Sequence, residues 1–416
     1  MTKTKIITFK LFFLIFIGCK TKQWQGQEAM QVINTTSVSI DYQKKGAYKM
    51  SNGVSISNNF AGAKLNNVDF INDTVVVTIS PENSPINDSP WYGFKLWANK
   101  NIEVNLKLVY QNELHRYYPK TSKDGISWAA LDSTKFHKGI IPPLNNPWQR
   151  PKSVSLNLSL DKDTLWVAAQ EIITSENNKK WINNLGKSYS INQFYIDKSG
   201  QNKNIDAFTF GNQESLKNLV VLSRQHPPEV TGYLAMQYFV QSLLEESQLS
   251  SDFLNQYKVI VIPMVNPDGV DLGNWRHNSN GIDLNRDWAS FNQPETNAIK
   301  SYFEKLKLKG QKFICMIDFH STWEDIFYTL DPSFKGQMPN LIPTLIKEMK
   351  SEIKDYNPNI SPRPLNEVRI NSMSYFYFEH KAEALVFEIG DNTPEAEIKL
   401  KSKVAASKLM KLMLNK

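Results

Sequence analysis

Between about residues 37 and 173, hydrophobic and polar positions tend to alternate with a period of two. Alternation of this kind, with many β-branched residues, is typical of half-buried β-strands. Clusters of proline, asparagine, serine and glycine separate the candidate strands. The clearest strand segments are 72–80, 101–110, 152–160 and 163–172. Because little in this region has the helical period, we predict an all-β sandwich domain at 37–173.

After about residue 174, short apolar runs alternate with segments of helical period. The apolar runs are 218–223, 257–265, 313–320 and 383–390, and the helical segments are 232–247, 295–306, 338–353 and 397–414. This alternation predicts an α/β domain at 174–416, with a parallel or mixed central sheet flanked by helices. Ligands of such sheets bind beyond the carboxyl ends of the strands, so we expect the chemistry of the chain there.

The N-terminus carries three lysines and then the apolar run 11–17. That run is too short for a membrane-spanning helix, which needs about 20 residues, so residues 1–18 are predicted to be a secretion signal. The sequence FIGC resembles a bacterial lipoprotein cleavage site, which would make Cys19 the lipidated first residue and 19–36 a polar tether. We expect an exported protein, periplasm-facing or at the cell surface, held to a membrane only by its lipid anchor. The alternative is an ordinary signal peptide cleaved nearby.

Charge and cysteine content narrow the function classes. The formal net charge is +7, and removal of Lys3, Lys5 and Lys10 with the signal would lower it to +4. The basic residues are dispersed, so we expect no nucleic-acid partner. The chain has two cysteines, Cys19 and Cys315. Lipidation of Cys19 would exclude a disulfide within one chain, and the apolar surroundings of Cys315 predict a buried core residue.

The first candidate chemistry lies in the segment RQHPPEVTG, residues 224–232. His226 and Glu229 fall between a strand that ends near residue 223 and a helix that begins near Thr231. Two prolines fix φ through this connection. Alone, the pair is weak evidence for a metal site, and a loop histidine beside a solvated glutamate is the simpler interpretation. His320, at the end of another strand, adds a second histidine, and two histidines with one carboxylate form a catalytic zinc set.

A glycine- and asparagine-rich segment, 266–288, is predicted to be a loop and carries Arg276, Asp283, Asn285 and Arg286. Arginines in a surface loop can serve solubility alone. Beside a zinc site, however, two arginines suit a substrate with a developing oxyanion and a permanent carboxylate, because the planar guanidinium binds carboxylates in a bidentate way.

Four segments in a fixed order resemble the zinc metallocarboxypeptidases. They are H-P-x-E at 226–229, N-P-D-G at 266–269 followed by Arg276 and D-x-N-R at 283–286, a strand that ends in His320, and a later strand that carries Glu388. The resemblance covers about 175–416. The preceding domain, with SPWYGFKLW and HRYYPKTSKDG, resembles the N-terminal domain of the cytosolic-carboxypeptidase-like branch.

The resemblance implies one zinc ion per chain and a peptide substrate with a free C-terminal carboxylate. The implied zinc ligands are His226, Glu229 and His320; Glu388 is the general base, Arg276 polarises the scissile carbonyl, and Asn285 and Arg286 hold the terminal carboxylate. Asp283 would orient a zinc histidine, or it is only a turn-forming aspartate.

Several points stay open at this stage. The family closes a tyrosine over the substrate; Tyr375 fits this position better than Tyr377, although packing alone explains either. Arg369 and Lys381 are candidates for binding an acidic side chain, or they are solvated. A zinc deacylase of N-acyl amino acids and a non-catalytic binding protein on the same fold are the alternative functions. The β-domain could assist folding or narrow access to the site.

Overall fold

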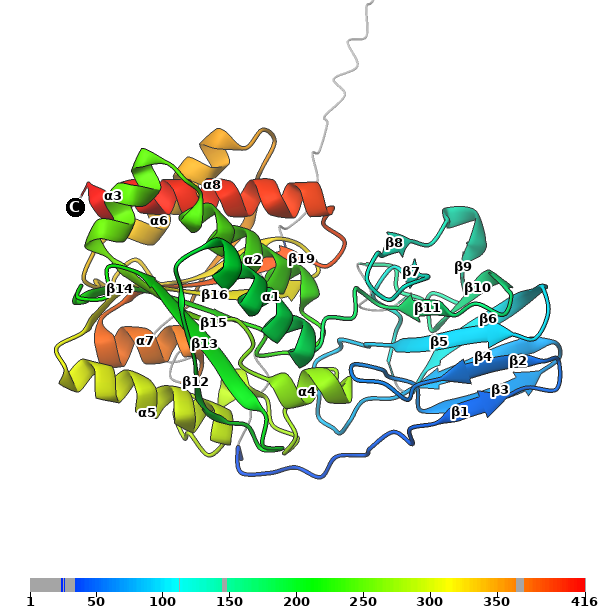
Figure 1. The fold of residues 1–416 in the computed structure, drawn as a ribbon. Helices are drawn as coiled ribbons and strands as arrows, with labels where there is room; N and C mark the ends of the chain where they lie inside the picture. The colour runs from blue at the N-terminus through cyan, green and yellow to red at the C-terminus, as the bar shows by residue number, and fades with distance from the viewer. Residues whose placement is uncertain are drawn as a thin grey trace, which may run out of the picture.

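The computed structural model describes residues 24, 26, 34–111, 113–143, 148–363 and 370–415. It confirms the predicted fold class: a strand-rich part precedes an α/β part with a mixed sheet and flanking helices (Figure 1). Residues 1–18 and Cys19 lie outside the described residues, as does Arg369. Within the described ranges, no helix has the length and apolar character needed to cross a membrane.

The β-domain, which we define as residues 47–168, consists of two sheets packed face to face. The six-stranded sheet has the order β1 (Ala47–Lys49), β2 (Val54–Ser57), β5 (Gly93–Ala98), β11 (Leu165–Ala168), β7 (Lys120–Ser122) and β8 (Ala129–Ala130). The five-stranded sheet has the order β3 (Asn67–Ile71), β4 (Thr74–Ile79), β6 (Ile102–Tyr110), β10 (Ser153–Leu160) and β9 (Phe136–Lys138), and η1 (Ser133–Lys135) precedes β9. Alternate residues of both sheets, such as Phe94 and Leu106, share one buried core.

The sheet of the α/β domain has eight described strands. Their order is β12 (Asn192–Lys198), β13 (Asn204–Gly211), β15 (Lys258–Ile262), β14 (Lys217–Ser223), β16 (Lys312–Thr322), β19 (Glu383–Gly390), β17 (Ile326–Leu330) and β18 (Asn359–Arg363). The four adjacent strands β15, β14, β16 and β19 are mutually parallel. Their carboxyl ends therefore meet at one edge of the sheet, where the sequence places the candidate site.

Helices cover both faces of this sheet. One face packs against α1 (Ser175–Ser188), α2 (Val230–Leu244), α3 (Gln248–Gln256), α6 (Leu341–Glu352) and α8 (Glu395–Leu414), and the other against α5 (Pro294–Leu308) and α7 (Ser372–His380) (Figure 1). Side chains alternate between the two layers: Leu219 and Val221 face the first, and Val220 and Leu222 the second. Cys315 is fully buried against the first layer, as predicted.

Segment 266–288 differs from the predicted loop, because it contains α4 (Pro267–Leu272) and the short η2 (Leu284–Arg286). Asn266 caps α4 by accepting the Gly269 N–H at 2.9 Å, and Pro267 occupies the first turn. Gly273 ends the helix in a left-handed conformation with φ 72°. The N-P-D-G motif is therefore a helix start, which brings the following residues back toward the sheet edge.

Candidate functional site

A cleft of about 100 Å³ lies at the carboxyl edge of the four parallel strands. Seven of the predicted site residues line it: His226, Glu229, Arg276, Asn285, Arg286, His320 and Glu388. The β-domain contributes Asn87 to the same cleft. The structure thus brings together residues that are up to 301 positions apart in the sequence.

The turn that carries His226 and Glu229 is held by its own backbone and by Arg224. The Arg224 Nε atom donates to the Pro227 carbonyl at 2.9 Å, and the Glu229 N–H donates to the His226 carbonyl at 3.3 Å. Arg224 itself has φ 57°, a left-handed conformation that is uncommon for a side chain with a Cβ. These contacts fix the spacing of the two candidate ligands, which lie in a turn and not on a regular helix.

Helix α2 begins directly after Glu229 and approaches β16 closely at Gly232. A Cβ atom at Gly232 would lie 2.3 Å from the His320 carbonyl oxygen, well inside contact distance. The Gly232 N–H also donates a hydrogen bond to Ser321 Oγ at 2.8 Å. Only glycine permits this approach, and the approach places Glu229 beside His320.

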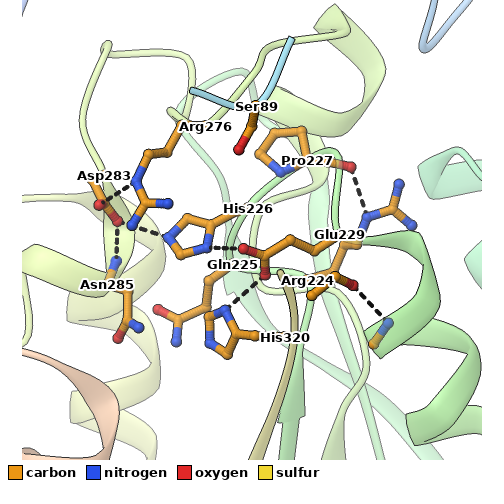
Figure 2. A network of polar contacts seen from close by, with 12 residues as sticks. Ser89, Arg224, Gln225, His226, Pro227, Glu229, Arg276, Asp283, Asn285 and His320 are labelled. Carbon is orange, nitrogen blue, oxygen red and sulfur yellow. Dashed lines mark hydrogen bonds and ion pairs between the residues drawn. The ribbon is translucent and has the colours of Figure 1, made fainter. Parts of the chain in front are cut away.

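His226, Glu229 and His320 form a compact metal-ligand group (Figure 2). The Nδ1 atom of His226 lies 2.7 Å from Glu229 Oε1, and the Nδ1 atom of His320 lies 2.7 Å from Glu229 Oε2. One ligand atom from each residue lies within 4.8 Å of the other two, and all three side chains are buried. Two imidazole nitrogens and one carboxylate are a donor set that suits zinc.

Each histidine has an aspartate carboxylate close to its Nε2 atom. Asp283 Oδ1 lies 2.9 Å from His226 Nε2, and Asp318 Oδ2 lies 3.0 Å from His320 Nε2. A carboxylate at Nε2 favours the tautomer that carries its proton there, which leaves the Nδ1 lone pair free for a metal. The arrangement is the one expected for two metal-binding histidines.

The charges of the group also fit a cation. Burial alone would raise the pKa of Glu229, but His226 and His320 hold it well below its usual value. Burial would lower the pKa of His320, but Asp318 and Glu229 raise it well above its usual value. The three side chains therefore favour a positive charge between them. Without a metal a proton supplies this charge, and with a metal the divalent ion supplies it.

Glu388 lies next to this group but is not part of it. Parallel pairing of β16 and β19 sets Glu388 directly opposite His320, and its Oε2 atom has no hydrogen-bond partner within the described part of the chain. Burial and the nearby Glu229 carboxylate raise the pKa of Glu388 to about 8. A cation bound by His226, Glu229 and His320 would oppose this shift.

Asp283 also connects the metal-ligand group to the arginine loop. Its Oδ2 atom accepts from Arg276 Nε at 2.7 Å, and its Oδ1 atom accepts from the Asn285 N–H at 2.8 Å (Figure 2). The Arg286 Nη1 atom donates to the Asn285 carbonyl at 2.9 Å. The Asp283 carboxylate therefore contacts three predicted site residues. They are His226, a candidate metal ligand, Arg276, predicted to polarise the scissile carbonyl, and Asn285, predicted to bind the terminal carboxylate of the substrate.

Tyr375, which was predicted to bind substrate, does not line the cleft. Its ring packs against Trp288 at 5.4 Å and Phe291 at 5.3 Å between ring centroids, in an aromatic cluster under α7. The tyrosine that lines the cleft is Tyr328 on β17. Lys381 is exposed at the end of α7 and precedes the opposite end of β19 from Glu388, so it does not line the cleft either.

Sequence reasoning also missed Asp318, Arg363 and the β-domain residue Asn87. Asp318 precedes His320 by two positions on one strand, so both side chains point to the same face; this spacing was an available signal. Asp318 also accepts from Gln225 and Ser372. Arg363 and Asn87 reach the cleft through tertiary packing, and no local pattern marks them.

A mixed sheet with this donor set at its carboxyl edge is the arrangement of a protein that binds one divalent metal, here beside a cleft lined by Arg276, Arg286 and Arg363. Comparison with known families is specific: the model of the zinc carboxypeptidase family matches residues 178–399. The chain belongs to this family, whose members use zinc, and the three grouped side chains fit one such ion.

Individual relatives agree with this assignment. Cytosolic carboxypeptidase 2 of Xenopus tropicalis is 35% identical over 107 residues, which are 25% of this chain and 11% of that protein. The metallo-carboxypeptidase of Burkholderia cenocepacia superposes with a TM-score of 0.68 at 16% identity, over 86% of this chain and 98% of that one. The metallo-carboxypeptidase of Pseudomonas aeruginosa, solved with (2-guanidinoethylmercapto)succinic acid, gives 0.65 at 17% identity over the same shares. The chain thus spans a small part of its frog relative, and the two bacterial structures share its fold.

Proposed function

We propose that the protein is a metallocarboxypeptidase that removes the C-terminal residue from peptides with a free α-carboxylate. One observation carries the proposal: a single cleft joins a three-residue metal-ligand group, the carboxyl group of Glu388, and three arginines, Arg276, Arg286 and Arg363. A metal group alone suits many hydrolases. The excess of arginine around it suits a substrate that is itself an anion.

Each residue has a role that follows from its position. His226, Glu229 and His320 would hold zinc, which when bound acts as a Lewis acid and lowers the pKa of a water molecule to about 7. Glu388, with its unbonded Oε2 atom, takes the proton of the attacking water and delivers it to the leaving amine. Proton transfer of this kind typically contributes about 10²–10⁴-fold to the rate.

The arginine loop supplies charge stabilisation and orientation. Arg276, fixed through its Nε atom by Asp283, stabilises the oxyanion that develops on the scissile carbonyl; loss of one such donor typically costs about 2.7–4 kcal/mol. Asn285 and Arg286 bind the terminal carboxylate of the peptide, which fixes the bond to be cleaved.

The test compares a peptide that has a free C-terminus with the same peptide amidated, and both with an N-acyl amino acid. We expect release of the C-terminal residue from the free peptide only. Equal cleavage of the amidated peptide would contradict binding of the terminal carboxylate by Asn285 and Arg286. Turnover of the N-acyl amino acid alone would indicate a deacylase. Glu388→Gln should keep zinc and lose about 10²–10⁴-fold in kcat, whereas Glu383→Gln, at the other end of β19, is the matched control.

We also propose that the protein is exported and anchored to a membrane through lipidated Cys19. The support is the sequence of residues 1–19. In cells fed an alkyne-bearing fatty acid, the parent chain should become labelled and sediment with membranes. Cys19→Ser should lose the label and leave the membrane fraction. A soluble, unlabelled parent chain would overturn the anchor.

A further inference from the structure

A loop of the β-domain reaches across to the arginine segment of the α/β domain. We call residues 80–92, between β4 and β5, the crossing loop. Asn83 Nδ2 donates to the Gly281 carbonyl at 3.0 Å, and Trp275 Nε1 donates to the Trp91 carbonyl at 3.0 Å. With Asn87 in the cleft, the crossing loop is part of the wall of the candidate active site.

Glu82 makes the most specific contacts of this loop. Its Oε2 atom accepts the Trp275 N–H at 2.8 Å, and its Oε1 atom accepts the Arg276 N–H at 3.0 Å and the His277 N–H at 2.9 Å. Three consecutive backbone N–H groups, centred on Arg276, thus converge on one carboxylate. Such a concave set of N–H groups is an anion-binding nest, and here the anion is a side chain of the other domain.

The segment around Arg276 needs an external partner. Residues 274–283 lie in neither a helix nor a strand, yet most of them, including 275–277, are buried, and buried N–H groups must be paired. Glu82 supplies the acceptors that a strand or helix would otherwise supply. It is fully buried itself, a position that a carboxylate occupies only when its hydrogen bonds and neighbouring charges compensate for lost water.

The surroundings of Glu82 provide that compensation. Lys64 is buried nearby, and His277 Nδ1 lies 3.3 Å from Glu82 Oε1. Burial alone would raise the pKa of Glu82, but His277, Lys64 and the Trp275 N–H hold it at about 2. The side chain therefore stays ionised, and its hydrogen bonds to the 275–277 backbone are charge-assisted.

We infer that Glu82 is a positioning residue for Arg276: it fixes the backbone from which the guanidinium is aimed at the scissile carbonyl. The inference rests on the proposed role of Arg276. Asp283 fixes the other end of the Arg276 side chain, so that Glu82 and Asp283 together leave it one orientation. The β-domain is then a structural component of the catalytic site.

The test uses Glu82→Ala and the milder Glu82→Gln in the full chain, each also combined with Arg276→Ala. Asp88→Asn is the matched control, because Asp88 lies in the same crossing loop and pairs with Arg150 instead. We expect Glu82→Ala to lower kcat by about 10²-fold and Glu82→Gln by about tenfold, with KM and zinc content kept. Neither change should lower kcat further when Arg276 is alanine.

A second readout does not need turnover. A phosphonic peptide carries a tetrahedral anion where the oxyanion forms, so its affinity should fall in the Glu82 variants, while the affinity for a free amino acid product should not. The inference would be overturned if kcat did not change in the Glu82 variants. It would also be overturned if kcat fell equally with and without Arg276, or if the fall in kcat followed a fall in zinc content. A parent protein that cleaves no peptide would overturn the proposed function, whereas unchanged phosphonate affinity in the Glu82 variants would overturn the positioning role alone.

Discussion

Asp283→Asn removes one charge and one acceptor from the carboxylate that connects the candidate metal site with the arginine loop. In the parent, three donors surround this side chain: His226 Nε2, Arg276 Nε and the Asn285 N–H. An amide has a single acceptor oxygen, and its NH₂ group can only donate. In one orientation the NH₂ group faces Arg276, and in the other it faces His226 and Asn285. At least one charge-assisted hydrogen bond, worth about 1.5–3 kcal/mol, is therefore lost.

Both orientations have a measurable consequence. If the NH₂ group faces His226, the histidine must accept at Nε2 and carry its proton at Nδ1, where the metal should bind. Loss of such a partner typically weakens metal affinity by about 10–100-fold, which is about 1.4–2.7 kcal/mol. If the NH₂ group faces Arg276, kcat should fall toward the loss expected for the missing oxyanion donor, about 10²–10³-fold.

Zinc affinity is measured by competition with a chromogenic chelator, and kcat is measured on the free-carboxylate peptide. Asp287→Asn is the matched control: Asp287 is also fully buried, and it accepts from the Asn292 and Gln293 N–H groups at 3.1 and 2.9 Å instead of from a candidate ligand. If Asp283→Asn changed neither zinc affinity nor kcat beyond the Asp287→Asn control, the assignment of Asp283 as the partner of His226 and Arg276 would be refuted.

Three further predictions follow from the same contacts. Asp318→Asn should weaken zinc binding by about 10–100-fold through His320; equal chelator competition in variant and parent would contradict this. Gly232→Ala places a Cβ 2.3 Å from the His320 carbonyl, so calorimetry should show lower thermal stability and zinc titration a weaker site. Gly46→Ala is the control, because a Cβ there meets nothing within 4 Å. Glu82 has a pKa of about 2 against an ordinary 4.5, so its stabilisation is fully present above pH 4.5 and is lost progressively as the pH falls from there through 2. In urea unfolding of the zinc-free proteins, the difference between parent and Glu82→Gln should therefore shrink by about 1 kcal/mol from pH 7 to 3.5, and a constant difference would contradict the low pKa.

The sequence predicted the parts of the site that follow from strand ends. His226, His320 and Glu388 each lie at or just after the carboxyl end of a parallel strand, and period-two alternation sets the face on which the latter two project. The sheet therefore brings them together without any information from loops. Cys315 was predictable for the same reason, since it occupies an inward position of β16.

Other parts depended on contacts that no local pattern encodes. Glu82 meets Arg276 across 194 positions, and Arg116 of the β-domain forms a buried ion pair with Asp391 at 2.7 Å across 275. Tyr375 does not line the cleft, because its ring packs inside against aromatic partners, among them Trp288. Whether an aromatic residue of α7 points to the cleft or to the core is decided by those neighbours.

Pairing of β16 with β19 has one more consequence, for the dynamics of the site. His320 and Glu388 are partners in the same ladder of hydrogen bonds, between two strands that are buried among helices on both faces. Separating the two side chains therefore requires opening the centre of the sheet, which is among the last regions of a domain to exchange its amide hydrogens. Loops around the cleft can fluctuate on fast timescales, while the spacing between His320, the proposed zinc ligand, and Glu388, the proposed general base, stays as persistent as the fold itself.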